Sequence, residues 1–250
     1  MKPRLRFPAL RGAVWQGRSR RQRGATMAEF AVAFPFALLL VLGIIQLGLM
    51  YTAKEIVNEA AFMAARAGSV QNAQVDAMNS EMVKALAPFY QDLTQKNDAT
   101  RLAVAYGRAF VDTVCIPFVQ CFLKVERLNP TDAAFDDFGI TSKSMQNHIY
   151  IPNDNLEYRP HSTQGPKSGM SIQDANALKV KVTYGYELKV PLMKAVFNAV
   201  MCGVDSGINA FGRGDTSYGT SSDCSDYYSK GRVPIVSYAT VQMQTPAWKK

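Results

Sequence analysis

The longest apolar stretch of the chain lies near its N-terminus. No residue from Phe30 through Ala53 is charged, which makes 24 consecutive uncharged positions. An α-helix rises about 1.5 Å per residue, so this segment would be roughly 36 Å long. Because a hydrocarbon core is about 30 Å thick, the pattern predicts a single membrane-spanning helix. Pro35 lies inside the span and is expected to kink or locally open the helix.

The helical pattern continues beyond the apolar span. Apolar residues recur at helical spacing at Ile56, Ala60, Met63, Ala67 and Val70. We expect this stripe to pack against the protein's own head rather than a partner, and we expect Gly68 to break or cap the helix.

A second helix is predicted within residues 69–98, with one apolar face and an end or bend at Pro88. The face consists of Val75, Met78, Met82, Leu86 and Phe89.

The period becomes strand-like in the second half of the chain. Short strands are expected at 102–106 and 121–125, and apolar and polar residues alternate strictly from Leu178 to Val190. Such alternation is typical of an antiparallel sheet with one wet face. A short apolar helix is expected from Leu192 to Met201, and a last strand from Val233 to Gln244.

The pattern therefore predicts an α+β fold, in which a long N-terminal helix precedes a head with an antiparallel sheet. The segments 129–176 and 203–231 are rich in Gly, Ser, Asp and Asn, which indicates loops. The expected divisions are a basic leader at 1–24, a transmembrane and stalk helix at 25–68, a second helical segment at 69–98 and the head at 99–250.

The net charge of +8 is concentrated in the leader. The remainder of the chain carries 20 Lys and Arg against 20 Asp and Glu, which argues against a nucleic-acid-binding face. Positive flanks stay in the cytoplasm, so we expect the N-terminus inside and the head outside. A cleaved secretory signal fits less well, because the apolar run is too long for one. The leader cations are Lys2, Arg4, Arg6, Arg11, Arg18, Arg20, Arg21 and Arg23.

Two polar side chains stand out at the apolar span. Gln46 could hydrogen-bond to a partner helix or face interface water. Glu29 lies at the edge of the span, where a carboxylate costs on the order of 2.5–3.5 kcal/mol and normally has a partner. If the chain were cut after Gly24, the free ammonium of Ala25 in one subunit could neutralise Glu29 of a neighbour. The carboxylate would then act in assembly.

This arrangement resembles the processing site of type IV prepilins, and most of all TadE-like proteins, the pseudopilins of Flp/Tad pilus systems. The resemblance implies an inner-membrane, single-pass protein that a prepilin peptidase cuts between Gly24 and Ala25. It also implies assembly contacts at Glu29 and Phe30 with other pilin or pseudopilin subunits and the assembly platform, and possible incorporation in a surface pilus. The arrangement of strand, short apolar segment, loop and last strand is also similar to the outer region of these proteins. The matching residues are Arg20, Arg21, Arg23, Gly24, Ala25, Glu29, Phe30, the Pro35-interrupted helix and the Ala-rich run 60–66.

All four cysteines follow the apolar span, on the side where disulfides persist. We expect the pairs Cys115–Cys121 and Cys202–Cys224, because each brackets a plausible loop; free buried thiols are the alternative. A metal site is not expected, since no Cys-x-x-Cys spacing occurs and the only histidines are His148 and His161.

No constellation for catalysis or cofactor binding is evident. The acidic clusters at 132–137 and 153–155 lack calcium-loop spacing and are interpreted as solvated turns. Arg213-Gly214-Asp215 matches an adhesive tripeptide, which is usually a chance match at this length. We therefore expect a structural pilus-assembly subunit or minor pilin and not an enzyme. The rivals are an uncut membrane anchor with a ligand-binding head, and an envelope enzyme.

Overall fold

The computed structural model describes residues 25–92, 94, 96–113, 122–141, 147–205 and 226–249. The leader with Gly24, three of the cysteines (Cys115, Cys121 and Cys224) and the tripeptide at 213–215 lie outside these residues. The chain divides into two units, residues 1–41 and 42–250.

The described part of the first unit is the beginning of helix α1, which spans Ala25–Val70. The helix is continuous through Pro35, so the local opening that the proline predicted is absent there, while the kink stays a prediction. Its large apolar side chains from Phe30 to Val41 are exposed, and the rings of Phe30 and Phe34 stack 5.3 Å apart.

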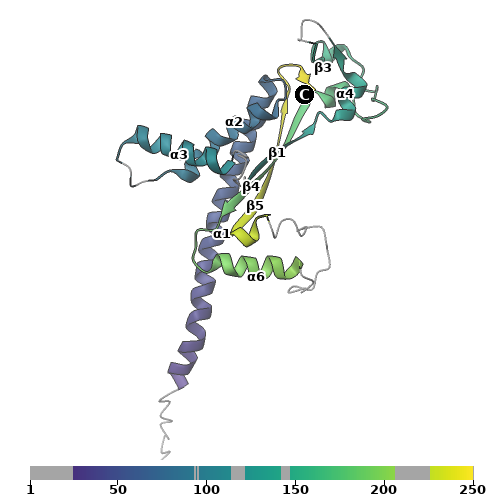
Figure 1. Ribbon diagram of the computed structural model, residues 1–250. Coiled ribbons are helices and arrows are strands. Elements are labelled where there is room, and N and C mark those ends of the chain that lie inside the picture. Colours follow the sequence, from purple (N-terminus) through teal and green to yellow (C-terminus); the bar gives the residue numbers. More distant parts are fainter. Residues whose placement is uncertain are drawn as a thin grey trace, which may run out of the picture. The chain divides into compact units, whose positions relative to one another are not determined.

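The second unit is built on a three-stranded antiparallel sheet, as the alternating pattern predicted. The order is β1-β4-β5, with β4 in the centre (Figure 1). On β4 the side chains of Leu178, Val180, Val182, Tyr184 and Tyr186 are buried, which confirms the predicted inward face. The bounds are Leu123–Asn129 for β1, Ala177–Glu187 for β4 and Arg232–Gln242 for β5.

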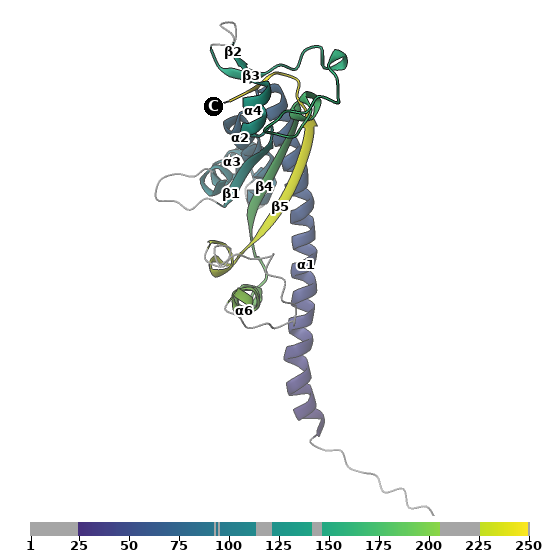
Figure 2. The same ribbon diagram turned by 90° about the vertical axis from the view of Figure 1, so that its right-hand side faces the viewer.

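The second half of α1 runs alongside this sheet (Figure 2). The buried residues of α1 and of β4 belong to one core cluster. The buried face of the helix consists of Ala53, Val57, Ala60, Ala61, Ala64 and Ala65.

The predicted stripe is confirmed only in part, because Ala60 packs in the core of the head while other members face outward. Of its members, Met63 and Val70 are exposed, at 40% and 51%. The larger apolar residues suggested one face, but close packing on a sheet favours alanine, whose single methyl group brings the helix nearer to the strands.

Gly68 does not end α1, which continues for two more residues. A Cβ atom at this position would lie 2.8 Å from Cγ of Met78 and 2.9 Å from Cδ2 of Leu178. The glycine is needed for this close approach and is not a cap.

The predicted second helix is present as α2 (Val75–Leu86), followed by the 3-10 turn η1 (Ala87–Tyr90) at Pro88. Met78, Met82 and Leu86 are fully buried, as expected for the apolar face.

The strand expected at 102–106 is wrong, because this segment lies in helix α3 (Asp98–Thr113). Its buried positions, Ala105, Ala109 and Thr113, recur every four residues. Leu102 and Tyr106, which suggested a strand, are exposed, and the intervening alanines favour a helix.

The segment 129–176, expected to be loop, contains short elements that contribute to the core. Phe135, Ile151 and Ile172 are buried there. Strands β2, β3 and β6 form a second small sheet in that order. The elements of this segment are α4 (Asp132–Phe138), β2 (Ile140–Thr141), β3 (Ile149–Ile151), η3 (Leu156–Tyr158) and α5 (Ile172–Ala175). Strand β6 (Ala247–Trp248) lies near the C-terminus.

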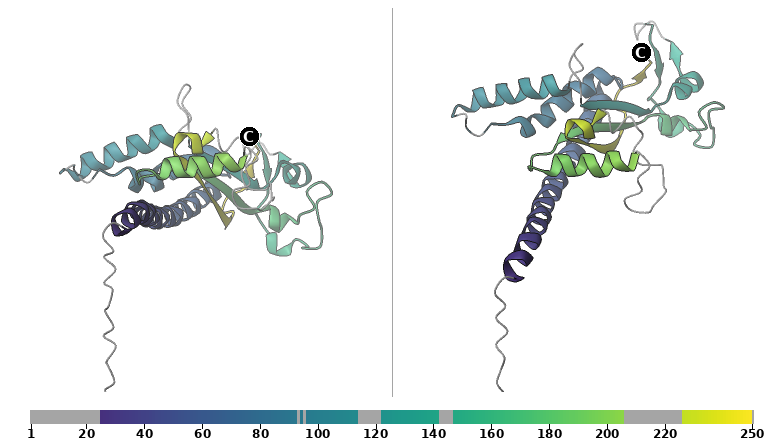
Figure 3. Two further views of the ribbon diagram at one scale, coloured as in Figure 1. Left: turned by 90° about the horizontal axis from the view of Figure 1, so that it is seen from below. Right: turned by 60° about the horizontal axis from the view of Figure 1, so that its bottom comes forward.

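The predicted apolar helix after β4 is α6 (Met193–Asp205), and the turn η4 (Tyr228–Lys230) precedes β5. In Figure 3, α6 is the green helix beside the yellow turn η4.

We expect Gly68→Ala to lower the free energy of unfolding by about 1–3 kcal/mol, because the added methyl group overpacks a filled site. Gly107→Ala is the matched control: it lies in a helix with nothing within 4 Å of an added Cβ. It should raise the free energy by about 0.4–1 kcal/mol. Denaturant unfolding of the full chain in detergent measures both, and equal effects of the two variants would contradict the packing role.

Candidate functional site

The predicted assembly residues lie in the first turns of α1. The described part of α1 starts at Ala25. Glu29 and Phe30 are both exposed. None of the ion pairs found among the described residues includes Glu29. The carboxylate is thus available to a partner from another molecule.

Among the described residues, α1 is the one helix long and apolar enough to cross a membrane. Most of its apolar side chains before Ala53 are exposed in the single chain. Such a surface is stable in lipid or against neighbouring helices, and costly in water.

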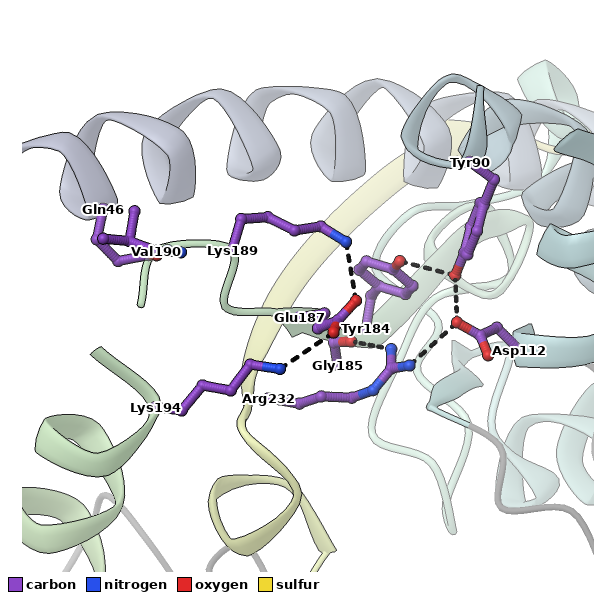
Figure 4. A network of polar contacts seen from close by, with 10 residues as sticks. All are labelled: Gln46, Tyr90, Asp112, Tyr184, Gly185, Glu187, Lys189, Val190, Lys194 and Arg232. Atoms are coloured by element: carbon purple, nitrogen blue, oxygen red, sulfur yellow. Dashed lines mark hydrogen bonds and ion pairs between the residues drawn. The ribbon is translucent and has the colours of Figure 1, made fainter. Parts of the chain in front are cut away.

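Gln46 is the exception on this part of α1. Counting from Ala25, Gln46 is the first described side chain of α1 that is buried, and it is completely buried. Its Oε1 accepts a hydrogen bond from the backbone N–H of Val190 at 3.0 Å (Figure 4). Gln46 was expected to contact a partner helix or interface water, but it hydrogen-bonds within the chain instead. This bond fixes the segment between β4 and α6 to the apolar span.

A small ion-pair cluster follows at the end of β4. Glu187 accepts from Lys189 at 2.8 Å and from Lys194 at 3.2 Å. The hydrogen bond from Lys189, with support from Lys194, lowers the pKa of Glu187 below its ordinary value despite partial burial. The cluster joins the strand to the first turn of α6.

A second polar network joins α3, η1, β4 and β5. Nη2 of Arg232 pairs with Oδ2 of Asp112 at 3.1 Å, and its Nη1 donates to the carbonyl of Gly185 at 2.9 Å. The Tyr90 hydroxyl donates to the same Asp112 oxygen at 3.0 Å. Since that proton is committed, Tyr184 is the donor in its 2.9 Å contact with Tyr90.

The network is well shielded from water. The Arg232 side chain is 13% exposed and that of Asp112 31%. Burial, with Tyr184 and Asp112 nearby, raises the pKa of Tyr90 far above its ordinary value, so the hydroxyl keeps its proton. The guanidinium of Arg232 also stacks on the ring of Phe122, 3.8 Å from its centre.

A cavity of about 290 Å³ lies between this network and α1. Its lining includes Leu49, Phe89, Tyr184 and Arg232, but neither histidine nor cysteine. His148 stacks on Trp248 in the second sheet, and His161 lies exposed after η3. The polar groups of this described lining hydrogen-bond to one another and join α3, η1, β4 and β5.

The acidic cluster at 132–137 lies on helix α4 and has partners from the chain itself. Asp136 pairs with Lys167 and Lys249, and Asp137 accepts backbone N–H groups of Lys167 and Ser168. The turn expected at 132–137 is therefore wrong, whereas residues 154 and 155 of the second cluster do lie in a turn.

Cys202 in α6 is disulfide-bonded. Because the other three cysteines lie outside the described residues, the pairing stays a prediction.

Sequence reasoning missed the Arg232 network and the Gln46 contact with Val190. Asp112 and Arg232 are 120 positions apart, and no local spacing links them. A lone Gln in an apolar span was the only available signal for the second contact.

Comparisons with known proteins concern the N-terminal segment. The model of the TadE-like protein family matches residues 24–66. No curated protein and no solved structure matches the chain. The matched residues include Gly24, Glu29 and much of α1, so the predicted resemblance is confirmed, and the sheet lies outside the match.

We expect Asp112→Ala to lower the free energy of unfolding by about 1–3 kcal/mol, because it leaves Arg232 and Tyr90 without their shared acceptor. Asp98→Ala on the same helix is the control; this residue is 86% exposed and pairs with Arg101. Its effect should stay below about 1 kcal/mol. Thermal unfolding of the detergent-solubilised chain compares them, and a control as damaging as Asp112→Ala would refute the network's role.

Proposed function

We propose that this chain, TadE-like over residues 24–66, is a pilin-like membrane subunit cut by a prepilin peptidase after Gly24. It acts in Tad pilus assembly or as a minor pilin. One observation carries the proposal: the described part of α1, from Ala25 on, exposes apolar side chains and a carboxylate, Glu29, that has no ion pair among the described residues.

Cleavage supplies a partner for this carboxylate. Hydrolysis of the bond after Gly24 creates an ammonium group on Ala25. The ammonium group of Ala25 and the carboxylate of Glu29 lie at the same end of one helix. In a bundle of helices, the ammonium group of one subunit reaches Glu29 of the next. A buried ion pair of this kind favours one stagger between neighbouring helices.

The head suits the side of the membrane opposite to the leader. Eight leader cations favour a cytoplasmic N-terminus, and the disulfide at Cys202 fits an oxidising compartment. The proposed location is thus the bacterial inner membrane with the head outside. The extended head favours a minor or initiating position over the bulk of a filament.

A second candidate is an uncut membrane anchor whose head binds an envelope ligand. The observation in its favour is the 290 Å³ cavity beside Arg232. An intact leader in the membrane-bound protein would favour this candidate.

The first test is the N-terminal residue of the protein recovered from membranes with and without the cognate peptidase. We expect a start at Ala25 that depends on the peptidase and is lost in Gly24→Val, because a side chain there blocks close approach to the cleavage site. Gly17→Val, in the same leader, should be cut normally. A start at Met1 or Lys2 in both strains would overturn the proposed processing.

The second test concerns Glu29. We expect Glu29→Ala to insert normally and to reduce cross-linking between subunits roughly tenfold, because the pair with the ammonium of Ala25 is lost. Glu59→Ala, an exposed glutamate beyond the apolar span of the same helix, is the control and should cross-link like the native chain. Unchanged cross-linking of Glu29→Ala would remove the assembly role.

A further inference from the structure

The start of α6 is held at the level of the apolar span. Gln46 lies 16 residues after Phe30, which corresponds to about 24 Å along a helix. A hydrocarbon core of about 30 Å that begins at Phe30 ends about one turn beyond Gln46. Val190, bonded to Gln46, precedes α6 by three residues. The helix therefore begins close to the outer edge of the hydrocarbon.

The direction of α6 suits this level. In Figures 1 and 2 the helix lies crosswise to the neighbouring part of α1. A helix crosswise to a membrane-spanning helix runs along the membrane surface.

Exposed apolar side chains lie on and next to α6. Leu192 is 62% exposed, Val200 37% and Met201 39%. In water these side chains gain nothing, whereas at the boundary of headgroups and acyl chains each of them is stabilised.

Cations accompany the apolar residues. Lys194 and Lys230 border a depression of about 340 Å³ between α6 and η4. The Lys194 side chain is half exposed even though it pairs with Glu187, and an ammonium group has three protons to donate. Lysine beside exposed apolar residues is typical of helices at a lipid surface, where the ammonium reaches lipid phosphates.

We propose that α6, with η4, forms a base by which the head rests on the outer surface of the membrane. Leu192, Val200 and Met201 enter the boundary between headgroups and acyl chains, while Lys194 and Lys230 lie among the phosphates. The contact of Gln46 with Val190 removes a polar group from the lipid and fixes the base at this depth. The inference depends on α1 crossing the membrane, as in the proposed function, but not on cleavage or assembly.

The test uses the full chain with single tryptophans in vesicles of brominated phosphatidylcholine, which quenches tryptophan that touches acyl chains. Trp15 and Trp248 are replaced by Phe. The probe is Met201→Trp, with Val200→Trp as a second variant in case the first does not fold. Val41→Trp in α1 reports on the span, and Leu102→Trp, exposed on α3, is the control away from the base.

We expect loss of fluorescence for Met201→Trp and Val41→Trp, and none for Leu102→Trp. Quenching at position 41 alone would overturn the proposed base and leave the proposed function standing. No quenching at either position would overturn both the base and the membrane part of the proposed function. An unquenched Met201→Trp whose emission shifts with protein concentration would also overturn the base and assign this face to a second copy.

Discussion

The packing of the alanine face of α1 on the sheet is the interaction on which the head depends. From Ala53 to Ala65 the helix presents methyl groups and Val57 to the core cluster that contains Leu178 and Val180. Each alanine buries little area, so the stabilisation comes from many close contacts along the helix. Larger side chains would hold the helix away from the strands, as the space around Gly68 shows.

Polar contacts fix the register of this packing. Lys54 donates to the carbonyl of Val236, Ser237 donates to Asn58 at 2.8 Å, and Gln244 donates to the carbonyl of Ser69 at 3.0 Å. Between the first and the last contact the helix rises about 22 Å and the strand region about 26 Å. The two elements thus run side by side in the same direction.

The sequence predicted the features that depend on local patterns of residues. The uncharged run, the alternation on β4, the face of α2 and the motif around Gly24 and Glu29 are all local patterns. It did not predict which face of α1 packs on the sheet. That face is rich in alanine, which packs closely there but is too small and weakly hydrophobic to stand out in the sequence. It also placed a strand at 102–106, where exposed Leu102 and Tyr106 imitate strand spacing. The Arg232 network depends on residues from four elements, and only the fold brings them together.

The central claim is that the membrane helix is also the core helix of the head. Hydrogen exchange of the full chain in lipid nanodiscs tests this claim most directly. If it holds, the amides of residues 53–68 exchange as slowly as those of β4 and β5, and they open together with these strands. Rapid exchange over 53–68 with a protected sheet would mean that the head folds without α1, and would contradict the account.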